Sequence, residues 1–366
     1  MKRIIIAVFS SVFIVIFGMI PTTAYANDLS SEESEISGQV DDILSDYEID
    51  YSFGEINDIS FSELIEKIKE SISGRLLAPV RVLGTLLIVI VFTAFLQSAG
   101  ESFLARDSSS NIYNMICVMT AVTIITPQLF TVYERASNAI ERSGGFLLVF
   151  VPIFAGITIA AGGITTGGVY NMLILGASEF IVALSRSFLL PIVSIITVLS
   201  VTGSVFPKGS INSLANLLKK FVTWGMTVAV TLFTGFITLK CTITGKADGV
   251  VTKTAKYVIS GFIPVIGGAV SDAYTTVKSS FSVISCTAGA AGVIGIVMLM
   301  LPPILEVMIF RGVMWIGTAA ADMLSAESLS KLMKGIDCGL AIAQSVLICY
   351  SMLFILCTAI LMQSLS

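Results

Sequence analysis

The sequence predicts an all-α polytopic membrane protein with about seven to nine membrane segments, several of them broken by glycine and proline. Two observations predict this class. Hydrophobic residues make up 55% of the 366 residues and charged residues only 13%, whereas a soluble domain carries roughly 25% charged residues. Several segments also run for about 20 residues with almost no charge, which is the length needed to cross ~30 Å of hydrocarbon.

The first 26 residues predict a secretory signal peptide. Lys2 and Arg3 precede an apolar run over residues 4–20, and a small-residue pattern ends at Ala26. A basic start, an apolar stretch and an A-x-A site describe such a peptide, with cleavage after Ala26. An uncleaved first helix is the alternative.

Residues 27–74 predict an acidic extracytoplasmic segment. They hold 14 Asp or Glu against Lys67 and Lys69, a net charge of −12. Within them, Asp58–Ile72 has apolar residues at helical spacing, which indicates an amphipathic helix. This helix would dock a partner, lie at the membrane interface, or simply lead into the first span.

Residues 75–366 predict the polytopic membrane domain. The clear spans are Leu76–Gln97, Ile112–Val132, Phe146–Ile164, Ser187–Phe206, Phe221–Leu239, Ala290–Phe310 and Leu340–Met362. Two further segments would cross the membrane or enter and turn back: Val169–Ser185 contains Glu179, and Tyr257–Tyr274 contains Asp272.

The lysines only partly define the topology. The loop Pro207–Lys220 is basic, which favours the cytoplasmic side. Lys240, Lys246, Lys253 and Lys256 then fall outside, against the positive-inside rule, so the side of the C-terminus stays open.

An internal repeat of about 112 residues is predicted from the prolines. Pro79, Pro191 and Pro303 are spaced by 112 residues each time, and Pro152 and Pro264 share that offset. The repeats would cover residues 75–186, 187–298 and, in part, 299–366. Repeats with helices broken at matching positions are typical of transport-type folds. General similarity among apolar sequences is the alternative.

The block Ile259–Ser280 (ISGFIPVIGGAVSDAYTTVKSS) is too apolar for a surface loop and too rich in glycine and polar residues for an ordinary span. Irregular backbone at membrane depth needs protein or water around it, so we expect hairpins here that neighbouring helices shelter. The hinge and polar positions selected as functional candidates are Gly261, Pro264, Gly267, Gly268, Asp272, Pro152, Gly156 and Glu179.

Ionisable residues inside spans are candidates because each costs about 2.5–3.5 kcal/mol at the helix centre on insertion scales. Besides Glu179 and Asp272, the segments contain Glu306, with Arg186 and Arg311 at segment ends. Glu306 and Arg311 are five residues apart and are expected to pair loosely. Glu179 and Arg186, seven apart, fall on one helical face. These residues would line a pathway, bind a partner helix, or pair structurally.

The sequence offers little for catalysis, and we predict no enzymatic activity, cofactor, metal or nucleic-acid partner. There is no histidine, and the six cysteines show no C-x-x-C spacing. The motif AGGITTGG at Ala161–Gly168 lacks the G-K-[ST] ending of a phosphate-binding loop. Energy for any transport would come from a partner or a gradient.

The leader, the acidic arm, the spans and SGFIPVIGGAVSDAYTTVKSS at Ser260–Ser280 together resemble the stage III sporulation protein AE family of endospore-forming bacteria. The resemblance implies a multi-pass protein of the mother-cell membrane facing the forespore, with its mature N-terminus extracytoplasmic. It implies a channel or secretion-like complex required for forespore development after engulfment. The implied partners are the other stage III sporulation A-operon proteins including the ATPase AA, stage II sporulation protein Q across the intermembrane space, a YidC-type insertase and the lipid bilayer. The resemblance implies no catalytic residues.

The sequence also allows two other functions to be considered. A stand-alone secondary transporter or permease would use Glu179 and Asp272 as coupling sites. An intramembrane aspartyl protease would need a second intramembrane aspartate beside Asp272. Asp248, Asp322 and Asp337 all lie in polar stretches, so this pair has no convincing second member.

Overall fold

The computed structural model of the chain describes residues 31–47, 49, 66, 77–103, 107–184, 187, 190–205, 211–262 and 267–365. These residues form eight α-helices and no strand. The helices are α2 (Ser31–Asp46), α4 (Leu77–Phe103), α5 (Asp107–Ala160), α6 (Ile164–Leu184), α7 (Leu190–Val205), α8 (Ile211–Phe262), α9 (Gly267–Met323) and α10 (Glu327–Leu365).

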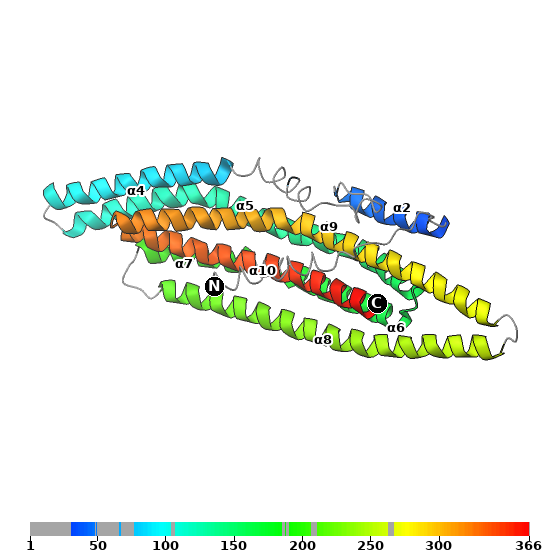
Figure 1. The fold of residues 1–366 in the computed structure, drawn as a ribbon. Helices are drawn as coiled ribbons and strands as arrows, with labels where there is room; N and C mark the ends of the chain where they lie inside the picture. The colour runs from blue at the N-terminus through cyan, green and yellow to red at the C-terminus, as the bar shows by residue number, and fades with distance from the viewer. Residues whose placement is uncertain are drawn as a thin grey trace.

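The helices form one elongated bundle in which long helices run side by side (Figure 1). α5, α8 and α9 have 54, 52 and 57 residues. At 1.5 Å per residue each is roughly 80 Å long, far more than the thickness of a bilayer. α10 contacts α9, α8, α7 and α5, so it lies at the centre of the bundle.

The all-α polytopic class is confirmed. Among the described residues, six helical segments are long and apolar enough to cross a membrane, and Pro191–Ser204 is a shorter apolar helix. The six are Ala78–Leu96, Met115–Ala160, Ile164–Ala183, Leu217–Thr254, Thr275–Met323 and Glu327–Gln363.

The boundaries of the spans differ from those expected. The predicted spans Ile112–Val132 and Phe146–Ile164 lie largely within one continuous helix, α5. The 13 residues between them are mostly helix-compatible and include no proline, so nothing in the chain ends the helix there. The segment Val169–Ser185, which the sequence left either crossing the membrane or turning back, lies almost wholly in α6. This helix is long enough to span the membrane.

A column of phenylalanines on α5 packs into a glycine groove on α9. Phe146, Phe150 and Phe154 follow each other at i, i+4, with ring centroids 5.3 and 5.8 Å apart. A Cβ added at Gly295 would lie 2.7 Å from the Phe146 ring, and one at Gly292 would overlap the Phe150 ring. The phenylalanine column can therefore lie this close to α9 only because the facing residues have no side chain.

The same column anchors other helices. Phe354 of α10 lies edge-on to Phe150, and Tyr170 of α6 lies edge-on to Phe154, with ring centroids 6.4 and 5.5 Å apart. The Tyr170 hydroxyl is 2.9 Å from that of Thr358, so α6 is also hydrogen-bonded to α10. The Tyr170 ring is therefore buried in the core while its hydroxyl finds a partner.

Part of the acidic arm packs on the bundle. Val40, Ile43 and Leu44 of α2 are buried. Tyr47 lies edge-on to Phe146 at 5.5 Å, and Ile49 fills the space in front of Gly295, 3.3 Å from where a Cβ would be. The arm therefore extends the core with its apolar stripe, which sequence analysis did not predict.

The C-terminal end of α8 and the N-terminal end of α9 lie at one end of the bundle and not at its centre (Figure 1). Lys278 of α9 donates to Thr252 of α8 and also packs on Gly162, in the turn between α5 and α6. Residues 253–262 and 267–277 therefore extend past that turn by about 15 Å. Pro264 and the side chains around it lie outside the described residues, so their expected shelter stays a prediction.

Other predictions also fall outside the described residues. These are the signal peptide over 1–26 and nearly all of the amphipathic helix over 58–72. Pro79 and Pro191 lie in the first turns of α4 and α7, whereas Pro303 lies inside α9. The repeat stays a prediction.

Replacing Gly292 with leucine is expected to destabilise the bundle, because the new side chain would occupy the volume of the Phe150 ring. Overpacking of this kind costs about 1–3 kcal/mol or more. Thermal unfolding of the purified protein in detergent would show it. Gly225→Leu is the control, since no atom lies within 4 Å of a Cβ there. Equal melting temperatures for the two variants would contradict the packing argument.

Candidate functional site

Two buried polar clusters stand out in an otherwise apolar bundle. The midsection cluster consists of Arg135, Glu306, Arg311, Asp337 and Gln344. The turn cluster consists of Thr165, Thr166, Thr244, Asp248, Thr252 and Lys278. Polar groups in a membrane domain are expensive unless they find partners, so these clusters are the candidate functional sites.

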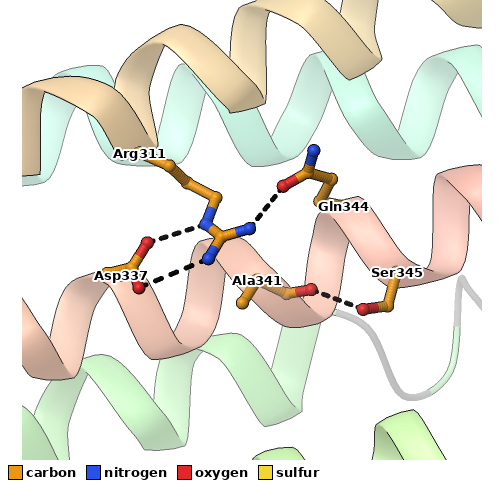
Figure 2. A network of polar contacts seen from close by, with 5 residues as sticks. All are labelled: Arg311, Asp337, Ala341, Gln344 and Ser345. Atoms are coloured by element: carbon orange, nitrogen blue, oxygen red, sulfur yellow. Dashed lines mark hydrogen bonds and ion pairs between the residues drawn. The ribbon is translucent and has the colours of Figure 1, made fainter. Parts of the chain in front are cut away.

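Arg311 is the centre of the midsection cluster (Figure 2). Its Nε donates to Asp337 Oδ1 at 2.7 Å and its Nη1 donates to Gln344 Oε1 at 2.5 Å. Nη2 reaches the other Asp337 oxygen at 3.4 Å, which makes the pair bidentate. The Arg311 side chain is only 8% exposed, and its guanidinium carbon lies 5.2 Å from the centre of the Trp315 ring.

The residues of α10 that bind Arg311 are placed by helical periodicity. Asp337 and Gln344 are seven residues apart, which puts both on the face that meets α9. Between them, the Ala341 carbonyl accepts a hydrogen bond from Ser345 at 2.7 Å, so this turn of the helix satisfies its own hydroxyl (Figure 2).

Glu306 does not pair with Arg311 as the sequence suggested. It binds Arg135 of α5 at 2.5 Å, and the two side chains are 5% and 46% exposed respectively. Residues five apart on a helix point in directions about 140° apart, so Glu306 faces α5 while Arg311 faces α10. The midsection cluster thus fastens α9 to two different helices.

The turn cluster holds the reversal between α5 and α6. Asp248 of α8 accepts hydrogen bonds from the backbone N–H groups of Thr165 and Thr166 at 3.1 and 3.0 Å, and from the Thr166 hydroxyl at 2.7 Å. These N–H groups belong to the first turn of α6, which has no partners of its own for them. Asp248 therefore acts as an N-cap supplied by another helix.

A cation lies at the other side of the same turn. Lys278 Nζ donates to Thr252 at 3.1 Å, and its side chain packs on Gly162 at the end of α5. Gly162 has φ of +91°, a conformation that favours glycine. A carboxylate at the start of α6 and an ammonium at the end of α5 both match the helix dipoles. The motif AGGITTGG is therefore a capped helix reversal.

The candidates selected from the sequence are not gathered in either cluster. Pro152 and Gly156 lie on the exposed side of α5, and Glu179 is exposed on α6. Gly261 is in the last turn of α8, and Gly267, Gly268 and Asp272 begin α9. The side chain of Asp272 lies outside the described residues.

Sequence reasoning missed Arg135, Gln344, Lys278 and the roles of Asp248 and Asp337. Arg135, Asp248, Lys278 and Asp337 lie in polar stretches, where a single charged residue gives no sign of the helix it faces, whereas Gln344 lies inside the predicted span Leu340–Met362. Spacing offered one signal: Asp337 and Gln344 are seven apart in an otherwise apolar helix face.

The chemistry of both clusters is that of structural pairing. Carboxylates Asp248, Glu306 and Asp337 each accept hydrogen bonds from N–H, hydroxyl or guanidinium groups of other helices. Within the described ranges, no three Cys, Asp or Glu side chains gather as a metal site would require. The clusters can fix helix positions, or release them if a partner is displaced.

Fold and sites together define a multi-pass α-helical membrane protein whose long helices are joined by buried ion pairs. The family model of Stage III sporulation protein AE matches residues 46–364. The chain therefore belongs to the stage III sporulation protein AE family, which implies a role in sporulation.

A curated relative, Stage III sporulation protein AE of Bacillus subtilis (strain 168), is 26% identical over 238 residues. The match covers 64% of this chain and 59% of that protein, so it spans about three fifths of the relative's length. No solved structure matches the chain.

Neutralising only one partner of the Arg311–Asp337 pair is expected to destabilise the protein strongly. Removal of one member leaves an uncompensated buried charge, which costs about 3–5 kcal/mol. Arg311→Met and Asp337→Leu should each lower the melting temperature, and the double variant should recover much of the loss. Lys331→Met, in an exposed pair with Glu327, should change little. Additive losses in the double variant would mean that the two side chains act independently.

Removing the cap of α6 is expected to loosen the turn between α5 and α6. Asp248→Ala should lower stability by about 1–2 kcal/mol, the usual value of an N-cap. It should also increase maleimide labelling of a cysteine introduced at Ile164, an exposed residue at the start of α6. Asp322→Ala, an exposed aspartate at the other end of α9, is the control. Unchanged labelling of the Asp248 variant would argue against the capping role.

Proposed function

We propose that this protein is a non-enzymatic membrane component of a channel or secretion-like complex that links mother cell and forespore and supports forespore development after engulfment. It would lie in the mother-cell membrane facing the forespore, with the mature N-terminus extracytoplasmic. Its partners would be the other stage III sporulation A-operon proteins including the ATPase AA, and stage II sporulation protein Q across the intermembrane space. A YidC-type insertase would assist its assembly.

The observation that carries this proposal is the filled centre of the bundle. Phe146, Phe150 and Phe154 lie fully buried between α5 and α9, and Phe354 of α10 meets them from the side. Side chains packed at van der Waals contact exclude water from the space between these helices. A chain built in this way suits a subunit whose transport path forms with partners.

The polar clusters favour the same role. The charged groups of the midsection cluster bind each other between helices at 2.5 to 2.7 Å. These ion pairs hold neighbouring helices together. A scaffold of long helices in a membrane requires such contacts.

A stand-alone secondary transporter is less well supported. Coupling carboxylates of transporters lie near the midplane, between helices or at broken helix ends. Glu179 is exposed on α6, whereas its neighbour Ser178 makes the buried α6–α10 contact with Tyr350. An aspartyl protease is also disfavoured, since Asp248 and Asp337 are held by donors from other helices.

Sporulation of the native host tests the proposal. Replacing Gly267 and Gly268 with leucine, or Asp272 with leucine, should block spore formation after engulfment while the protein still reaches the membrane. The reason is that the α8–α9 hairpin would lose the shape with which it meets partners. Glu179→Gln should sporulate normally, whereas a transporter that couples through this residue would lose its activity.

Two measurements are needed: the count of heat-resistant spores and co-purification of the operon products with the tagged protein. Normal spores from both the glycine and the aspartate variants would refute a role for the hairpin. A failure of the wild-type protein to co-purify any operon product would refute the complex.

A further inference from the structure

The outer face of α2 is acidic. The helix contains six acidic residues and no basic one. Its apolar stripe, Val40, Ile43 and Leu44, is buried against the bundle, and Asp42 and Asp46 are exposed on the opposite side. We call Asp42 and Asp46 the acidic stripe.

The outer face of α8 is basic. Lys240, Lys246 and Lys253 are exposed, and Lys240 also lies over the Phe236 ring at 5.7 Å. The aspartate of this segment, Asp248, is turned inward and capping α6. The exposed side therefore carries lysines without a compensating carboxylate from its own segment. Lys246 and Lys253 are seven residues apart and so share one helix face. We call these two lysines the basic stripe.

Both stripes occupy the same stretch of the bundle axis. Two contacts on α9 allow the positions of α2 and α8 along the bundle axis to be compared. Ile49, three residues after the end of α2, packs at Gly295, and Thr252 of α8 binds Lys278. These two levels are 17 residues apart, or about 25 Å along α9. α2 has 16 residues and runs from the Gly295 level toward the end where α8 meets α9 (Figure 1). The acidic stripe is thus level with the basic stripe.

The two stripes cannot meet within one chain. α2 packs on α5 and α9, whereas α8 packs mainly on α10 and α6. Figure 1 shows α2 along one side of the bundle and α8 along the other. Among the described residues, neither Lys246 nor Lys253 forms an ion pair with an acidic side chain of α2.

We propose that the acidic stripe of α2 in one copy docks on the basic stripe of α8 in a second copy. Two copies in the same membrane have roughly parallel axes, so stripes that are level in one chain stay level between chains. Opposite charge then faces opposite charge along two helices. The contact joins different surfaces of the two copies, so it is heterologous and repeats into a ring or an open array.

The exposed lysines of α8 also argue against a helix surface that contacts only lipid. Charged side chains in hydrocarbon are costly, and here three of them are exposed within 14 residues of a helix whose preceding segment is apolar. A partner that supplies carboxylates removes this cost, and α2 supplies them at the right level.

Charge reversal tests the contact on the purified full-length protein in detergent, with mass measured by light scattering. The wild type should self-associate at low salt, and its apparent dissociation constant should rise at least tenfold in 0.5 M salt, because exposed charge pairs are screened. A variant with Lys246 and Lys253 both changed to glutamate should be monomeric. A variant with Asp42 and Asp46 both changed to lysine should be monomeric too.

Restoration distinguishes docking from misfolding. Combining both sets of changes in one chain restores opposite charges and should restore self-association, and mixing the two separate variants should give mixed oligomers. Lys220→Glu, at an exposed position on α8 away from the stripe, should behave as wild type.

Three results would overturn the proposal: self-association that survives either reversal, a combined variant that stays monomeric, or a basic-stripe variant whose only defect is weaker binding to vesicles of anionic phospholipid. The last would assign the lysines to lipid headgroups. Because this assay reads the mass of the purified protein, its failure is separate from failure of the sporulation test.

Discussion

The packing of the phenylalanine column against the glycine groove is the contact on which the other helix positions depend. In a membrane, helices gain little from burying apolar surface against each other, because lipid is equally apolar; close packing must supply the stabilisation. The absence of side chains at Gly292 and Gly295 lets α5 and α9 approach closely over the length of the column. α10, α6 and α2 then dock through Phe354, Tyr170 and Tyr47 on aromatic rings that this contact has fixed.

The polar clusters depend on the register in which α5 packs against α9. Glu306 and Arg311 lie on α9 beyond the glycine groove, and they meet Arg135 and Asp337 only if α9 is set correctly against α5 and α10. At the other end, Asp248 and Lys278 complement the two helix ends of one turn from two other helices. Buried ion pairs add little net stability, yet a wrong register would leave charges unpaired at high cost. They therefore select one arrangement of long helices that could otherwise slide.

These features give a consistent view of the molecule as a part of a larger assembly. Among the described residues, the core is closely packed, the charged groups of the midsection cluster are paired, and the outer faces of α2 and α8 carry opposite charge. A protein that carried solute by itself would be expected to show the reverse, with polar groups lining the interior. The membership in a sporulation family agrees with this view, while the interaction surfaces come from the geometry of α2 and α8.

The sequence by itself determined the class: its apolar content and run lengths allow only membrane helices, because backbone groups in lipid must be bonded within the segment. It did not locate the reversal between α5 and α6, because the predicted span Phe146–Ile164 runs through the turn that contains Gly162. Only the tertiary structure decided which helices are continuous, that Glu306 pairs with Arg135 instead of Arg311, and that Asp248 caps α6. Partners such as Thr166 and Asp248, or Arg135 and Glu306, are 82 and 171 residues apart. No local pattern encodes such pairs, because they arise from how helix faces meet in space.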